Sequence, residues 1–76
     1  MELNDFIKKF AEQFEETAPE EIQANTEFKN LEEWSSLTAL SILAMVDDEY
    51  DVALKGDDIK NAVTVEDLFN KVASKA

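Results

Sequence analysis

Residues that interrupt regular structure are almost missing from this chain, which has one glycine and one proline among 76 residues. A β protein of this size needs many turns, and turns draw heavily on these two residue types. The composition is still that of a folded protein, because 45% of the residues are hydrophobic. We therefore expect one all-α domain, residues 1–76, near the lower size limit for a single core.

The spacing of apolar residues predicts where the first helix lies. Steps of three and four residues near the start of the chain mark one amphipathic stripe: Leu3, Phe6, Ile7, Phe10 and Phe14. This helix should end before Pro19, because the residue that precedes a proline avoids the α region. Residues 17–34 show no sustained period. They predict a long loop, held to the core by three isolated apolar residues: Ile22, Phe28 and Leu31.

Residues 36–50 predict a second long helix. Drawn at about 100° per residue, its core face should contain Ala39, Ile42, Leu43, Val46 and Tyr50. Thr38 and Met45 are expected to point away from that face. A flank between the two faces should hold Ser36, Leu37, Leu40, Ala44 and Asp47. The acidic run 47–51 lacks the glycine and glutamate that a calcium loop requires, so it indicates a solvated helical face.

Two further helices complete the expected fold. A short one near residues 57–61 follows Gly56 and should offer Ile59 to the core. Thr64 should cap the last helix, since its hydroxyl can accept a free N–H while Asp67, three residues on, reaches back. The prediction is a four-helix bundle in outline: three longer helices, one short helix and a long first loop.

Charge and missing residue types exclude several functions. The formal net charge is −11, and the chain contains neither cysteine nor histidine. Such acidity repels nucleic acids and anionic membranes and suits basic patches on proteins, or it serves solubility alone. Without histidine, the usual general base and the usual metal ligand are missing, and no catalytic residue and no metal site is identified. We expect a cytoplasmic protein without membrane insertion, because neither a signal segment nor a membrane-spanning run is present.

Two adjacent serines stand where the second helix should begin. Serine is among the best N-cap residues, so Ser35 is expected to accept the N–H of Leu37 or Thr38. Ser36 then becomes the first helical residue and has no structural duty. Its hydroxyl would project from the positive end of a helix, where a phosphate ester is stabilised. The alternative is that both serines act only in starting the helix.

The residues around these serines suggest a docking surface. Leu37, Leu40 and Ala44 form an apolar strip next to Ser36, and two acids, Asp47 and Asp48, follow it. Trp34 has two interpretations. It is either a hydrophobic staple that packs on the first turns of the helix, or an exposed aromatic residue beside a site.

At these residues the chain resembles the acyl carrier proteins of the small free-standing kind. Their motif is Asp-Ser-Leu at the start of the second helix, and Ser35-Ser36-Leu37 stands in that place. The resemblance covers almost the full length, to Thr64-Val65 at the start of the last helix. Serine replaces the usual aspartate of the motif. Trp34 in the preceding turn resembles carriers dedicated to specialised pathways.

The resemblance implies a covalent 4′-phosphopantetheine on Ser36, attached by a phosphopantetheinyl transferase with Mg²⁺ and coenzyme A. Its thiol would carry acyl groups as thioesters in fatty acid or related lipid or polyketide biosynthesis. The expected partners are acyl-loading and acyl-modifying enzymes with basic patches, which bind a monomer transiently through Trp34, Leu37, Leu40, Ala44, Asp47 and Asp48. Two alternatives stay open: an aminoacyl or peptidyl carrier of the same fold, and a cofactor-free acidic interaction module.

Overall fold

The computed structural model describes residues 2–76, whose regular elements are helical. The four α-helices in this range are α1 (Leu3–Ala11), α2 (Ser36–Tyr50), α3 (Gly56–Asn61) and α4 (Val65–Lys75). The connection between α1 and α2 contains two single 3-10 turns, η1 (Pro19–Glu21) and η2 (Phe28–Asn30). The predicted bundle of three longer helices and one short helix, with a long first loop, is confirmed.

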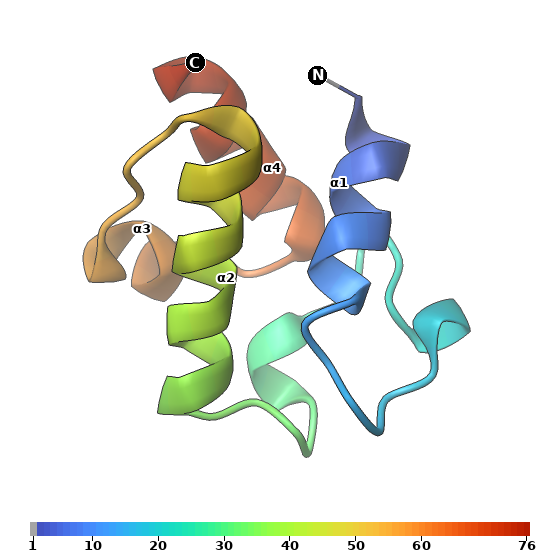
Figure 1. Ribbon diagram of the computed structural model, residues 1–76. Helices are drawn as coiled ribbons and strands as arrows, with labels where there is room; N and C mark the ends of the chain where they lie inside the picture. Colours follow the sequence, from blue (N-terminus) through green and yellow to red (C-terminus); the bar gives the residue numbers. More distant parts are fainter. Residues whose placement is uncertain (1) are drawn as a thin grey trace.

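The start of α2 lies at the opposite end of the bundle from the start of α1 and the end of α4 (Figure 1). Figure 1 shows the first turn of α1 and the last turn of α4 at one pole of the molecule, and the first turn of α2 at the other. None of the helices among residues 2–76 combines the length and the apolarity needed to span a membrane.

Aromatic rings tie α1 to the long connection. Phe10 and Phe28 have no exposed surface, and their ring centroids lie 5.4 Å apart in an edge-to-face arrangement. Phe14 is buried although α1 ends at Ala11, because a turn in which the Phe14 N–H donates to the Ala11 carbonyl keeps its ring on the core. The apolar stripe therefore extends past the helix that it predicts.

The long connection is held as the sequence predicts, and also by its backbone. Ile22 and Phe28 are buried, and Leu31 is half-buried against the same core. In addition, the connection accepts two hydrogen bonds from the start of α4. The Val65 N–H donates to the Thr26 carbonyl at 3.1 Å, and the Glu66 N–H to the Ala24 carbonyl at 2.9 Å. These bonds satisfy two of the free N–H groups of a helix start.

The predicted core face of α2 is confirmed at Ile42 and Val46, which have no exposed surface, but its rotation is wrong at the edges. Thr38 and Met45, which were expected to point outward, are 9% and 7% exposed, whereas Ala39, Leu43 and Tyr50 are only half-buried. Thr38 tolerates burial because its hydroxyl donates to the Glu33 carbonyl at 2.9 Å.

The same rotation moves the predicted flank of α2. Its members lie on the solvent-facing side of the helix rather than at the edge of the core: Ser36, Leu37, Leu40, Ala44 and Asp47. Ile42 and Val46 have no exposed surface, so the centre of the buried face lies between them and Thr38.

The last two helices follow their local signals closely. Ile59 of α3 is buried, as predicted. At the start of α4, the Thr64 hydroxyl accepts the Asp67 N–H, and the Asp67 carboxylate accepts the Thr64 N–H, both at 3.1 Å. α2 ends where Asp51 adopts a left-handed conformation with φ of 58°, which aspartate tolerates better than most residues.

Candidate functional site

The two serines at the start of α2 have different surroundings. Ser35 is the N-cap residue, and its Oγ accepts the Thr38 N–H at 3.3 Å and lies 3.2 Å from the Thr38 hydroxyl. Ser36 is the first residue of the helix and is exposed. Within residues 2–76, the Ser36 hydroxyl makes no hydrogen bond, so this oxygen is free to react.

The positive end of α2 is not neutralised by its own first turn, which consists of Ser36, Leu37, Thr38 and Ala39 and contains no acid. The free N–H groups and the helix dipole at such an end stabilise a negatively charged ester. A phosphodiester on the Ser36 oxygen fits this environment, because the hydroxyl is exposed and the adjacent charge is favourable.

The turn that leads into α2 is fixed by Glu33. One of its carboxylate oxygens accepts the Glu15 N–H at 2.6 Å, and the other accepts the N–H of Glu16 at 3.0 Å and both the N–H and the hydroxyl of Thr17 at 2.8 Å. Desolvation alone would raise the pKa of Glu33, but the hydrogen bonds from Thr17, Glu15 and Glu16 together hold it below its ordinary value of 4.5. No sequence pattern predicts this role.

Trp34 packs on the core side of the same turn. Its ring centroid lies 4.9 Å from that of Phe28 and 6.4 Å from that of Phe14. These contacts are with the long connection rather than with the first turns of α2, so the packing differs from a hydrophobic staple. The side chain is half-buried and keeps an exposed part beside the start of the helix.

The apolar strip next to Ser36 is open to solvent. Leu37 is 76% exposed and Leu40 is 60% exposed, and Ala44 is exposed one turn further on. The three side chains thus form an exposed apolar strip along α2. Val63, between α3 and α4, is 52% exposed. It directly precedes the Thr64 cap and lies between the buried residues Ala62 and Val65.

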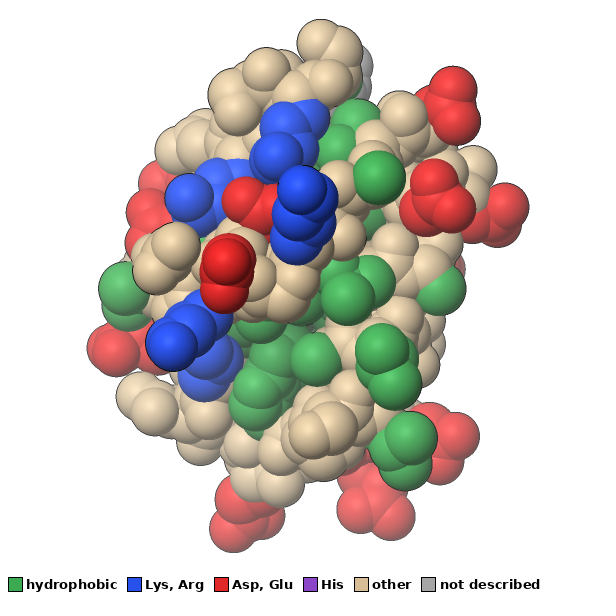
Figure 2. Space-filling view, turned by 90° about the vertical axis from the view of Figure 1, so that its left-hand side faces the viewer, with side chains coloured by type: hydrophobic (Ala, Val, Ile, Leu, Met, Phe, Trp, Pro, Cys, Tyr) green, Lys and Arg blue, Asp and Glu red, His purple; other side chains and the backbone are tan. Residues whose placement is uncertain are grey.

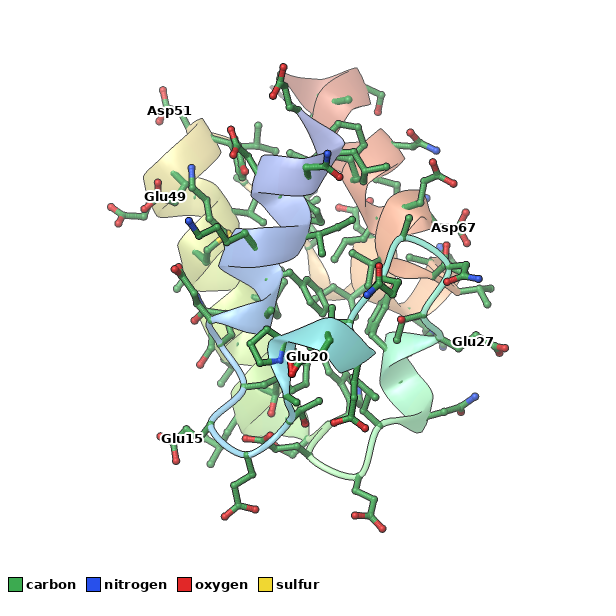
Figure 3. All side chains as sticks on the ribbon, turned by 90° about the vertical axis from the view of Figure 1, so that its right-hand side faces the viewer. Glu15, Glu20, Glu27, Glu49, Asp51 and Asp67 are labelled. Atoms are coloured by element: carbon green, nitrogen blue, oxygen red, sulfur yellow. The ribbon has the colours of Figure 1, made fainter. Side chains whose placement is uncertain are left out.

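The predicted acidic residues lie at the far end of α2. Asp47 and Asp48 are exposed, and together with Ala44 they line an open groove of about 550 Å³ between α2 and the end of α1. Figure 3 shows Glu49 and Asp51 at this same end of the helix, and Glu15 and Glu27 on the long connection. Glu49 pairs with Lys9 of α1 at 3.2 Å, so part of this charge is used within the fold.

Positive charge is concentrated on another face. Figure 2 looks at the α3 side of the molecule, where lysine side chains gather beside acidic ones and next to a band of hydrophobic side chains. Four of the seven lysines belong to this part of the chain: Lys55, Lys60, Lys71 and Lys75. Within the described residues, no group of acidic side chains is arranged to hold a metal ion.

Comparison with protein families adds to this geometry. The family model for the phosphopantetheine attachment site matches residues 5–72. The chain belongs to this phosphopantetheine attachment family. The match includes α1, the long connection, α2, α3 and most of α4. It agrees with the resemblance to acyl carrier proteins that rests on residues 35–37.

Members of the phosphopantetheine attachment family bind 4′-phosphopantetheine covalently on a serine. This chain is therefore a phosphopantetheine carrier. A comparison with curated proteins gave no match.

Proposed function

We propose that Ser36 is the attachment serine and that the protein is an acyl carrier protein. The observation that carries this assignment is the division between the two serine hydroxyls. Both serines are exposed, but the Ser35 oxygen is engaged with Thr38, whereas the Ser36 oxygen, at the positive end of α2, makes no hydrogen bond within residues 2–76. Only the second is available to react without loss of the helix cap.

In the loading step, the Ser36 Oγ gives its proton to the transferase and forms a bond to the β-phosphorus of coenzyme A. The bond between that phosphorus and the bridging oxygen breaks, and adenosine 3′,5′-bisphosphate leaves. The attached group supplies a thiol that holds acyl groups as thioesters. The chain itself contains no cysteine, so no thiol of its own competes for the cargo.

The chain's own contribution is to present the arm and to bind successive enzymes. Leu37, Leu40 and Ala44 would be buried against a partner beside the attachment point. Asp47 and Asp48 would steer a basic patch toward the far end of the same helix. The exposed part of Trp34 would extend the apolar contact. We infer a monomer that forms transient complexes in the cytoplasm and serves fatty acid or related lipid or polyketide synthesis, without catalysing a reaction itself.

Mass spectrometry of two serine variants tests the assignment. After incubation with a broad-specificity phosphopantetheinyl transferase, coenzyme A and Mg²⁺, the wild-type chain should gain the mass of the arm. Ser36→Ala should gain nothing. Ser35→Ala is the matched control, and it should still be modified while it loses about 0.5–1 kcal/mol of stability. Modification of Ser36→Ala would falsify the assignment, and no modification of the wild type would favour a cofactor-free interaction module.

A further inference from the structure

Both carboxylate oxygens of Glu33 accept hydrogen bonds from the long connection. The carboxylate accepts hydrogen bonds from three successive backbone N–H groups, at Glu15, Glu16 and Thr17, and from the Thr17 hydroxyl. The donors are 16 to 18 residues away in sequence. A carboxylate that accepts several N–H groups makes stronger bonds than a neutral acceptor would. The long connection, four to six residues after α1 ends, and the turn before α2 are thus joined through one carboxylate.

The backbone of Glu33 continues this connection toward the serines. Its carbonyl accepts the Thr38 hydroxyl at 2.9 Å, and Thr38 is the residue whose N–H is capped by Ser35. Hydrogen bonds of a single residue, Glu33, therefore connect the loop at residues 15–17 with the first turn of α2. Trp34 adds a packing contact on the core side, but it does not restrain the polar side of the turn.

We propose that Glu33 is a positioning residue for Ser36, and that it increases the fraction of molecules in which this serine is presented correctly to the phosphopantetheinyl transferase. The inference rests on the proposed function of Ser36. Glu33 does not touch the reacting atoms. It acts through the turn at residues 33–35, because that turn sets where α2 begins and which serine hydroxyl stays free.

The chemistry of the contact selects the test variant. Glu33→Gln keeps the length of the side chain but replaces one acceptor oxygen by an NH₂ group, which faces N–H donors and cannot accept their bonds. Glu32→Gln is the matched control, since it makes the same change of charge at the adjacent, exposed position. Thr64→Ala is a second control that removes the cap of another helix and lowers stability without touching the turn.

Steady-state kinetics of a broad-specificity transferase, with coenzyme A and Mg²⁺, should separate these variants. A molecule that is competent only part of the time has a weaker apparent affinity, in proportion to that fraction. Glu33→Gln should therefore raise the KM for the carrier by about three- to ten-fold and leave kcat within about two-fold. Glu32→Gln and Thr64→Ala should leave both constants close to those of the wild type.

Backbone amide hydrogen exchange gives a second measurement that does not depend on the transferase. In the wild type, the amides of residues 15–17 should be protected, and Glu33→Gln should expose them to exchange. The amides of Ser36, Leu37 and Thr38 should also exchange faster in Glu33→Gln, and by a larger factor than in Thr64→Ala.

Several results would overturn the inference. Wild-type kinetics for Glu33→Gln would refute it while leaving the proposed function intact. Equal losses in Glu33→Gln and Thr64→Ala, at equal loss of stability, would reduce Glu33 to a general stabilising residue. Fast exchange at residues 15–17 in the wild type would show that the contact does not persist in solution. A wild type that is never modified would refute the proposed function, and this inference with it.

Discussion

Replacing Phe28 by alanine should remove a large share of the stability of this small protein. Phe28 has no exposed surface, and its ring contacts those of Phe10 and Trp34 at 5.4 and 4.9 Å. A phenylalanine-to-alanine change in a core costs about 3–5 kcal/mol. Each edge-to-face aromatic contact contributes about 0.5–1.5 kcal/mol beyond area burial, so we expect a loss in the upper half of that range, about 4–5 kcal/mol.

This loss is large in comparison with the whole. At about 0.05–0.15 kcal/mol per residue, a 76-residue domain has a free energy of unfolding of about 4–11 kcal/mol. Phe28→Ala should therefore lie close to its unfolding midpoint at room temperature if the wild type is at the lower end of this range, and should stay folded with about half its stability if the wild type is at the upper end. Phe28→Leu, which fills much of the cavity, should stay folded and show a smaller loss.

Urea denaturation measures the effect with two probes. Far-ultraviolet circular dichroism reports the helices, and the fluorescence of Trp34, the single tryptophan, reports the loop that Phe28 anchors. Val63→Ala, at a position that is 52% exposed, is the control and should change stability by less than about 0.5 kcal/mol. A loss below about 1.5 kcal/mol in Phe28→Ala would contradict the anchoring role, since the loop would then be held without this ring.

Three further predictions concern charge. Backbone N–H groups of Thr64 and Val63 lower the pKa of Asp67 below its ordinary value of 3.8, so its contribution to stability is present above that pH and disappears as pH falls. Asp67→Asn should be less stable than the wild type at pH 7 and nearly equal to it at pH 2, by thermal denaturation. Because the net charge is −11, added NaCl or Mg²⁺ should raise the Tm at pH 7, by about 4–8 °C for each kcal/mol of repulsion screened, and a flat Tm would contradict this. A carrier with Asp47→Lys and Asp48→Lys should react more slowly with its cognate enzyme, mainly at low salt, whereas unchanged low-salt kinetics would make these acids a solvated face only.

The parts of the fold that could be predicted from the sequence depend on neighbours within a few residues. The reciprocal hydrogen bonds between Thr64 and Asp67 span one turn, so the spacing of the two residues alone predicts the start of α4. The stripe through Phe6 and Phe10 likewise fixes the buried face of α1, because the other side of that helix is polar.

The rotation of α2 could not be predicted in this way. Its apolar residues lie on nearly every side, since Leu37 and Leu40 are kept outside while Ile42 and Val46 are buried. The spacing of the apolar residues therefore does not single out one face of α2 as the buried one. The burial of Thr38 depends on an acceptor, the Glu33 carbonyl, whose position is set by the fold of the preceding turn. A residue scale that treats threonine as polar places it outside.

The contact of Glu33 with residues 15–17 could not be predicted from the sequence either. Its donors are backbone N–H groups, which every sequence has, and they come into range only because the long connection brings residues 15–17 next to the turn before α2. Exposed glutamates are common in this chain, so nothing distinguishes this one from Glu32 before the fold is known. The residue types near the serine indicate a site, but its restraints come from tertiary contacts.

The serine at position 35 is best understood together with Glu33, the acidic residue that precedes it most closely. The acyl carrier motif has an aspartate there, which would cap α2 and also place a negative charge beside the attachment point. In this chain Ser35 keeps the cap, and the nearest preceding acid, Glu33, has its carboxylate turned to the N–H groups of residues 15–17. The first turn of α2 therefore contains no carboxylate. A phosphodiester on Ser36, the proposed attachment residue, would meet the helix dipole without a competing charge. Ser35 therefore keeps the capping role of the family's aspartate without its charge.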